Sequence, residues 1–325
     1  MAYNSLSELF TATANAIRRK TGGTDPIVAN DFPAAIEGIS VGGSADEEWI
    51  GDGNTHLWIH LEEGRTSPML GVCPNGTVTV DWGDETEPDV LTGTDTTVVQ
   101  WTPNHEYATR GDYVITLTVD GEMGFGGSVA TNEHAYILRY SSAADSRNAV
   151  YQNALQKAEL GNSVTSIGHY AFNSCYSLAS IAIPDSVTSI GHYAFISCYS
   201  LASIAIHDSV TSIGDYAFKA CYSLASIAIP DSVTSIGSNV FSTCYSIASI
   251  AIPDSVTRIG VGAFYDCFGM KFYDFTSCAT VPTLVNTSAF RGIAADCEIR
   301  VPAALAEEWK AATNWSTYAD HIVGV

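Results

Sequence analysis

The 325-residue sequence is poor in basic residues and has no long hydrophobic run. It contains 14 Lys and Arg against 35 Asp and Glu, which gives a formal net charge of −21. Because so acidic a chain repels phosphate backbones and anionic lipid, we expect neither nucleic acid nor a membrane surface as a partner. No stretch approaches the roughly 20 apolar residues of a membrane-spanning helix.

Export signals and catalytic motifs are also missing. The N-terminal sequence MAYNSLSELFTATANAIRRK lacks the early positive region and the unbroken apolar core of a signal peptide. We therefore expect a protein that is made in a cytoplasm and leaves the cell on lysis. The sequence contains no G-x-S-x-G, Walker loop, H-E-x-x-H or dinucleotide fingerprint, so we expect no enzyme activity and no cofactor.

The eight cysteines form no C-x-x-C pair, which argues against a zinc site or a disulfide framework. Five of them, from Cys175 to Cys267, are 23 residues apart. This spacing predicts a ladder of small, buried, reduced thiols, with oxidation between neighbouring thiols as the alternative.

The first segment, residues 1–39, predicts a helical hairpin. Apolar residues between Leu6 and Ile17 fall on one helix face, and Asp31 begins a second short helix. This hairpin is too small to bury a core alone, so we expect it to attach to a neighbour or to form a homo-oligomer. The polar stretch 40–48 predicts a linker.

The second segment, residues 49–140, predicts an acidic β-sandwich. Residues 46–148 carry 18 acidic against 4 basic side chains, so the negative charge is concentrated here. Antiparallel strands are typical of a sandwich when apolar and polar residues alternate between turn residues. The stretches with this pattern are 55–63, 76–84, 96–102 and 111–121.

Two stretches of this segment resemble the PKD family of immunoglobulin-like domains. VDWGDETEP at 80–88 resembles the W-G-D turn of the family, and HEYATRGDYVITLTV at 105–119 resembles its H-x-Y and G-x-Y-x-V-x-L-x-V motifs. Glu85 stands where the family often has Gly. The resemblance implies a spacer or binding module.

The acidic turn of this segment has two interpretations. Asp81, Asp84 and Glu85 could hold Ca²⁺, which prefers hard oxygen ligands. The favoured alternative is a turn that is locked by hydrogen bonds from side chains to the backbone, without a metal.

The third segment contains five copies of a 23-residue repeat without insertion or deletion. A fixed period of this length is typical of a leucine-rich-repeat solenoid, whose stacked coils bury a shared apolar set. LASIAIP at 178–184 predicts the strand of each coil, and Gly191 and its equivalents predict a turn that needs backbone freedom. The copies begin at Leu160, Ile183, Ile206, Ile229 and Ile252.

The repeated words IPDSVTSIGxxAFxxCxSLxSI resemble the BspA-like bacterial leucine-rich repeat, a family of microbial surface proteins and phage-encoded proteins. With degenerate flanking coils, the resemblance implies a solenoid over 149–302, and residues 303–325 resemble the helical C-terminal cap of the family. The predicted fold is therefore multidomain and mainly β: a helical hairpin, a PKD-like sandwich, and a capped solenoid of 23-residue coils.

Variation between the copies identifies candidate ligand-binding residues. The strand residues hardly change, whereas residues just after the glycine and just before the cysteine do, and only residues outside the core are free to differ. We predict binding through two sets beside the glycine, through Lys219, and through a tyrosine ladder, because Tyr among Ser is typical of binding surfaces and aromatic ladders also stack on sugar rings. Packing between coils is an equally good explanation of the ladder. The first two sets are His169, His192 and Asp215, and Tyr170, Tyr193 and Tyr216; the ladder is Tyr176, Tyr199, Tyr222 and Tyr245. A metal pair at His169 and His192 is disfavoured, because two histidines alone seldom hold a metal.

The order of the segments resembles phage or prophage tail-associated proteins of Gram-positive gut bacteria. NAIRRKTGGTDPIVANDFPAAIEGI at 15–39 resembles the short module that opens many of them. The resemblance implies a virion protein whose N-terminal module contacts other tail proteins and whose solenoid binds a bacterial surface glycan or protein. The alternatives are a bacterial surface adhesin, located outside the cell, and a structural virion decoration without a ligand.

Overall fold

A computed structural model describes residues 50–62, 66–127, 137–139 and 153–325. These residues all belong to one compact unit, Trp49–Val325. The helical hairpin predicted for 1–39 and the linker predicted for 40–48 lie outside the described residues.

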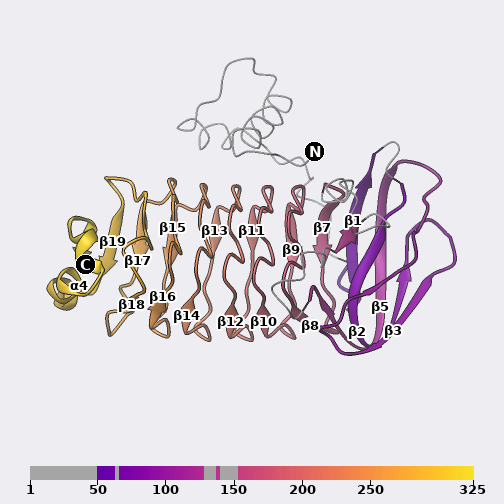
Figure 1. Ribbon diagram of the computed structural model, residues 1–325, viewed down its shortest axis with the longest axis horizontal. Helices are drawn as coiled ribbons and strands as arrows, with labels where there is room; N and C mark the ends of the chain where they lie inside the picture. The colour runs from indigo at the N-terminus through magenta and orange to yellow at the C-terminus, as the bar shows by residue number, and fades with distance from the viewer. Residues whose placement is uncertain (1–49, 63–65, 128–136, 140–152) are drawn as a thin grey trace, which may run out of the picture. The chain divides into compact units, whose positions relative to one another are not determined.

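The repeats form a solenoid whose coils stack in parallel, which confirms the prediction (Figure 1). Each coil has two short strands on opposite sides. The sequence predicted the strand that contains L-A-S-I, but not the second strand at V-T-S-I. The first row of strands is β7 (Leu155–Glu159), β9 (Ser180–Ala182), β11 (Ser203–Ile204), β13 (Ser226–Ile227), β15 (Ser249–Ala251), β17 (Phe272–Asp274) and β19 (Glu298–Val301). The second row is β8 (Val164–Ile167), β10 (Ser189–Ile190), β12 (Ser212–Ile213), β14 (Ser235–Ile236), β16 (Arg258–Ile259) and β18 (Thr283–Leu284).

A column of phenylalanines runs through the solenoid core. Neighbouring rings in this column lie 5.1–5.8 Å apart, and each side chain is at most 1% exposed. Full burial of one such side chain contributes about 1.5–3 kcal/mol, so the column is a main source of stability. Its members are Phe172, Phe195, Phe218, Phe241, Phe264 and Phe290.

The repeated cysteines, Cys175 to Cys267, form a second buried column, and all eight cysteines of the chain are buried free thiols. The Cys198 and Cys221 Sγ atoms each donate a hydrogen bond to a phenylalanine carbonyl of the preceding coil, at 3.1 and 3.2 Å. Burial raises the pKa of Cys175 and of Cys267 to about 12. The thiols are therefore neutral donors that link one coil to the next.

The repeated glycines are required by close packing and not by backbone freedom, which corrects the prediction. None of them has a positive φ. A Cβ at Gly191 would lie 2.5 Å from the Gly168 carbonyl carbon, and a Cβ at Gly214 would lie 2.5 Å from the His192 nitrogen. The backbones of successive coils therefore touch at these positions.

The region before the solenoid is built from antiparallel strands. The predicted strands correspond to β1 (Thr55–Leu61), β2 (Met69–Asp81), β4 (Gln100–Trp101) and β5 (Gly111–Phe125). Strand β3 (Asp89–Thr94), which pairs with β2, and strand β6 (Leu138–Arg139) were not predicted. β2 pairs with β4 and β6 through its first residues and with β3 and β5 through the rest, so it belongs to two sets of strands.

This β-region and the solenoid share one continuous sheet. β1 pairs antiparallel with β7, and β5 pairs parallel with β8. Both strand rows of the solenoid therefore continue into the β-region. The Phe125 ring lies 5.7 Å from Phe172 and extends the phenylalanine column. The β-region thus covers the N-terminal end of the solenoid core, which a terminal coil would otherwise expose.

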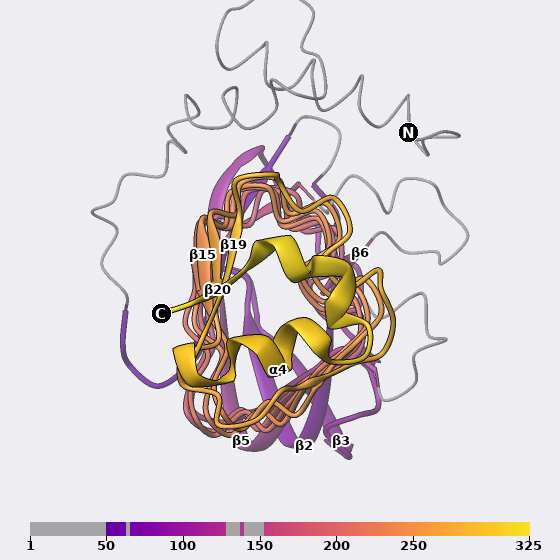
Figure 2. The same cartoon turned by 90° about the vertical axis from the view of Figure 1, so that its left-hand side faces the viewer.

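Helical turns cover the other end, as predicted (Figure 2). They are η2 (Ala303–Leu305), α4 (Ala306–Ala311) and η3 (Trp315–His321), and β20 (Ile322–Gly324) then pairs with β19. Trp309 and Trp315 are buried against Phe275. Trp315 Nε1 donates to the Pro282 carbonyl at 2.7 Å, whereas Trp309 Nε1 is buried and has no hydrogen-bond partner among the described residues. No helix of the described residues is long and apolar enough to cross a membrane.

Candidate binding edge of the solenoid

The variable residues of the repeat lie on the turn that follows the second strand of each coil. We call this turn the variable edge; it comprises residues 169–174, 192–197, 215–220, 238–243 and 261–266. Backbone hydrogen bonds join successive coils along it, such as Tyr170 N to His192 O at 3.0 Å and Phe172 N to Ala194 O at 2.8 Å. Side chains at equivalent positions are therefore held in register.

The first row of the variable edge caps the backbone of the next coil. His169 Nδ1 accepts a hydrogen bond from the backbone nitrogen of His192, and His192 Nδ1 accepts one from Asp215, both at 2.7 Å. Asp215 Oδ1 accepts in the same way from Ser238 at 2.6 Å. Because Nδ1 is the acceptor, the neutral His192 ring carries its proton on Nε2. This row has a structural role, and it still exposes 38% of the His192 and 43% of the Asp215 side chain.

The second row consists of three stacked tyrosines in an unusual backbone conformation. Tyr170, Tyr193 and Tyr216 have φ values of 59°, 59° and 60°. Their rings are 4.8 and 4.7 Å apart and within 10° of parallel. A left-handed backbone at a bulky residue costs about 1–3 kcal/mol, so these side chains occupy the position against a conformational penalty.

The remaining coils show what the backbone of the second row prefers. The equivalent residues are Asn239 (φ 54°) and Gly262 (φ 60°), the two residue types that best tolerate this conformation. The three tyrosines are half-buried, and desolvation followed by repulsion from Tyr170, Tyr216 and Asp215 raises the pKa of Tyr193. The Tyr193 hydroxyl is therefore neutral at physiological pH.

The third variable position contributes less to an exposed surface. Lys219 Nζ lies 5.4 Å from the centre of the Tyr216 ring, a cation–π contact. Ser242, at the equivalent position, is buried. Lys219 thus extends the exposed surface of the tyrosine row, whereas Ser242 does not.

The tyrosine ladder that begins at Tyr176 is more deeply placed. Its rings are 4.7–5.0 Å apart, and Tyr222 and Tyr245 are only 8% and 9% exposed. Burial, followed by the charges of Asp266 and neighbouring thiols, raises the pKa of Tyr245 to about 12. The burial of Tyr222 and Tyr245 fits the explanation in which these tyrosines pack between neighbouring coils. The ladder ends on Phe268, which is 46% exposed.

Stacking has the same chemical consequence in both tyrosine rows. Stacked rings whose centroids lie 4.7–5.0 Å apart leave no room for a sugar ring between them. Only ring edges, hydroxyl groups and the outer faces of terminal rings remain accessible. Binding through the variable edge would therefore depend on hydrogen bonds and not on ring stacking.

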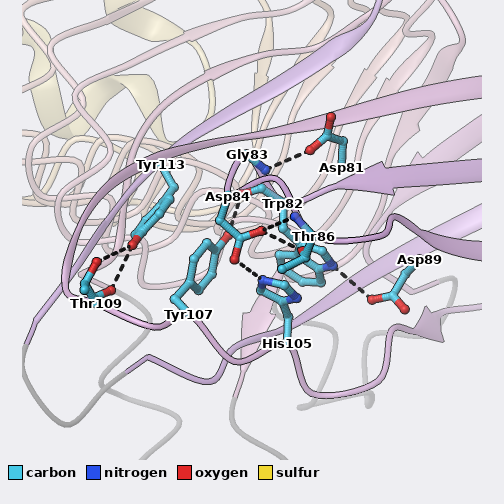
Figure 3. A network of polar contacts seen from close by, with 10 residues as sticks. All are labelled: Asp81, Trp82, Gly83, Asp84, Thr86, Asp89, His105, Tyr107, Thr109 and Tyr113. Atoms are coloured by element: carbon cyan, nitrogen blue, oxygen red, sulfur yellow. Dashed lines mark hydrogen bonds and ion pairs between the residues drawn. The ribbon is translucent and has the colours of Figure 1, made fainter.

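The acidic turn of the β-region forms a compact polar network (Figure 3). Asp81 Oδ1 accepts from Gly83 N at 2.9 Å, and Asp84 accepts from Thr86 and, at 2.9 Å, from His105 Nε2. Burial alone would raise the pKa of Asp84, but the hydrogen bonds from Thr86 and His105 outweigh it and lower that pKa. Asp81 and Asp84 thus make the hydrogen bonds that are expected for a turn locked by its own side chains.

The same network fixes the tryptophan of the turn. Trp82 stacks on His105 at 4.4 Å, donates from Nε1 to Asp89 at 2.9 Å, and its carbonyl accepts from the Tyr107 hydroxyl at 2.9 Å. Glu85, the third calcium candidate, has a φ of 65°. Within the described ranges, no three His, Cys, Asp or Glu side chains are arranged to hold a metal ion.

Sequence reasoning found the residues of the variable edge but missed two of their properties. It did not predict that the first row caps the next coil, and it did not predict the left-handed backbone of the second row. The signal for the latter was present, because Asn239 and Gly262 occupy the position in the last two coils.

Comparison with known proteins agrees with this architecture at the level of the repeat. Residues 146–271 match the family model of the BspA type leucine rich repeat region, in six copies. No curated protein matches the chain.

The solved structures that are similar to parts of the chain include three leucine-rich repeat proteins. A leucine-rich repeat protein of T. pallidum is 33% identical over 42% of this chain and 64% of its own, with a TM-score of 0.39. A leucine-rich cell surface protein of Faecalibacterium prausnitzii is 25% identical over 47% and 55%, with a TM-score of 0.29. A leucine-rich repeat protein of Bacteroides ovatus is 19% identical over 69% and 70%, with a TM-score of 0.34. This chain thus spans 64% and 55% of the first two proteins.

The family match overlaps the stacked coils, whose strands run from Leu155 to Val301. The matched family is a repeat region and not an enzyme family. The chain therefore contains a BspA-type leucine-rich repeat region, which the family model places at residues 146–271.

Proposed function

We propose that the protein is a non-enzymatic recognition protein that binds a bacterial cell-surface glycan or protein through the variable edge of its solenoid. The observation that carries this proposal is the row Tyr170, Tyr193 and Tyr216. Three coils place a bulky, half-exposed side chain where the backbone favours Asn or Gly, and such strain is often retained for function.

We further propose that this recognition serves a phage tail. The N-terminal module, residues 1–39, resembles the module that opens tail-associated proteins and would attach the chain to other tail proteins or to further copies of itself. Residues 49–140, which resemble a PKD domain, would act as the spacer. Because β1 and β5 pair with β7 and β8, this spacer would hold the solenoid rigidly.

Cell binding by the full chain tests the recognition role. We would compare the labelled wild type with Y170N/Y193N/Y216N on a panel of Gram-positive gut bacteria. The Asn substitutions reproduce the residue at position 239, so they suit the left-handed backbone. We expect strain-selective binding by the wild type and a loss of at least about tenfold in the variant, since the shorter Asn side chains cannot replace the contacts of three tyrosine hydroxyls.

A matched control separates this effect from general surface change. S203N/S226N/S249N introduces three asparagines at exposed serines of the first strand row, one per coil. It should bind as the wild type does. Equal loss in both variants, or no wild-type binding to any strain, would contradict the proposal and favour a structural role.

The alternative location is the bacterial surface, because the BspA-like family includes both microbial surface proteins and phage-encoded proteins. Fractionation of native cells and virions with an antibody against the chain separates the two. Signal in purified virions supports the tail proposal, whereas signal in the cell envelope of uninfected cells supports an adhesin.

A further inference from the structure

The polar groups of the variable edge form two parallel rows with a single period. The tyrosine rings of the second row advance by 4.8 and 4.7 Å per coil, and the His169 and His192 rings of the first row by 4.8 Å. Three successive coils therefore present nearly identical groups to a ligand. A site with translational repeats suits a ligand whose own units repeat at the same step.

The groups on these rows are hydrogen-bonding groups. Among the described residues, neither the Tyr193 nor the Tyr216 hydroxyl makes a hydrogen bond. Beside them, His192 offers an Nε2–H donor and Asp215 a carboxylate that accepts. Each coil thus places a hydroxyl next to a second polar group.

The period distinguishes between classes of polymer. A β-strand repeats its side-chain direction every two residues, or about 6.6 Å, which does not match one coil. A polyproline helix repeats in about 9.3 Å, close to two coils, but proline-rich segments dock on open aromatic faces, and here the ring faces are closed by stacking. Nucleic acid is disfavoured by the net charge of −21.

We propose that the variable edge binds a linear polysaccharide that lies along the solenoid axis, with one sugar unit per coil. A pyranose unit of an extended glycan advances about as far as one coil, and it carries several hydroxyls that can pair with Tyr193, Tyr216 and His192. This inference rests on the proposed function and adds the ligand class, the orientation and the mode of contact.

The extent of the polar rows sets the length of the bound glycan. The rows cover the coils of Tyr170, Tyr193 and Tyr216, and they end where Ser238 and Asn239 replace the larger side chains. Three consecutive sugar units therefore occupy the site.

The test uses the full chain in four binding measurements. Binding is measured on a bacterial strain that the wild type recognises, on the same cells after protease treatment, on the same cells after periodate oxidation, and with the isolated wall polysaccharide as a soluble competitor. The decisive variant is Y170F/Y193F/Y216F, which keeps the stacked rings and removes only the hydroxyls. Thermal unfolding confirms that it folds as the wild type does.

We expect binding that survives protease, is lost after periodate oxidation, is competed by the polysaccharide, and falls at least about tenfold in the Phe variant. Loss after protease with resistance to periodate would overturn the glycan proposal and leave surface recognition intact. Undiminished binding by a folded Phe variant would overturn the hydroxyl contacts. Failure of the wild type to bind any cell would overturn both proposals together.

Discussion

The β-region and the solenoid reach stability by opposite means. In the β-region, the Asp84–His105 contact and the Trp82–Asp89 contact each occur once and involve residues with no equivalent elsewhere. In the solenoid, the contacts of Gly214, His192 and Phe218 recur in neighbouring coils. The comparison shows that a contact that recurs in every coil can be predicted from the period of the sequence, whereas a contact that is made once cannot.

The largest effect is expected where two coils touch. In G214A, the new Cβ would lie 2.5 Å from the His192 backbone nitrogen, which cannot move without separating the coils. We expect the free energy of unfolding to fall by about 3 kcal/mol, at the upper end for overpacked sites. Chemical denaturation measures it, with the exposed-site variant S226A as a control that should stay within about 0.5 kcal/mol of the wild type. Equal stability of G214A and S226A would contradict the close-packing role of the glycines.

A smaller loss of stability is expected when the hydrogen-bond network around Asp84 in the β-region is broken. D84A removes the acceptor of Thr86 and His105, and hydrogen bonds to a charged group contribute about 1.5–3 kcal/mol. We therefore expect a loss of about 2 kcal/mol at pH 7.

The pH dependence of this effect follows from the lowered pKa of Asp84. A carboxylate whose pKa is lower in the folded state stabilises the fold above its unfolded pKa, about 3.9, and this contribution disappears as the pH falls through the folded pKa. The difference between wild type and D84A should therefore shrink below about pH 4. Urea unfolding at pH 7 and pH 3 tests this, and a difference that stays constant would rule out the ionised Asp84.

A loss of about 1 kcal/mol is expected for a single cap between coils. H192A removes the acceptor for the Asp215 backbone nitrogen, whereas H192D supplies a carboxylate in the way that Asp215 does for Ser238. We expect thermal unfolding to show destabilisation in H192A and recovery in H192D. If the two variants unfold alike, the first row does not act through its caps.

The smallest effect is expected in the C-terminal cap. Trp309 is fully buried, and its Nε1 donor has no hydrogen-bond partner in the part of the chain that the structure describes. W309F removes this unsatisfied donor while keeping an aromatic ring, so the lost packing and the relieved desolvation nearly offset each other. We expect a change within about 1 kcal/mol by chemical denaturation. A loss above about 3 kcal/mol would show that the indole nitrogen has an essential partner.

The solenoid could be predicted from the sequence because its core residues recur at one period. Phe195, Cys198 and their equivalents stand 23 residues apart, so their stacking follows from the repeat alone. The C-terminal cap followed from its resemblance to the cap of the BspA-like family and from the need to cover the last coil.

Other features depend on contacts that the sequence does not display. The pairing of β1 with β7 joins residues about 100 positions apart without any shared period. The role of Gly191 was misjudged because close approach and backbone freedom both select glycine. For the candidate site, the variable residues were identified, but the closed ring faces became visible only when the coils were stacked.

The most direct test of the account is to change the length of the tyrosine row by one coil in each direction. Y216N shortens it to two rings, and N239Y lengthens it to four in a position with the same left-handed backbone. Binding of the full chain to a recognised bacterial strain should increase from Y216N to wild type to N239Y, by about fivefold per coil, since one hydrogen bond contributes about 1 kcal/mol. Binding that does not depend on the number of tyrosines would contradict recognition through the variable edge.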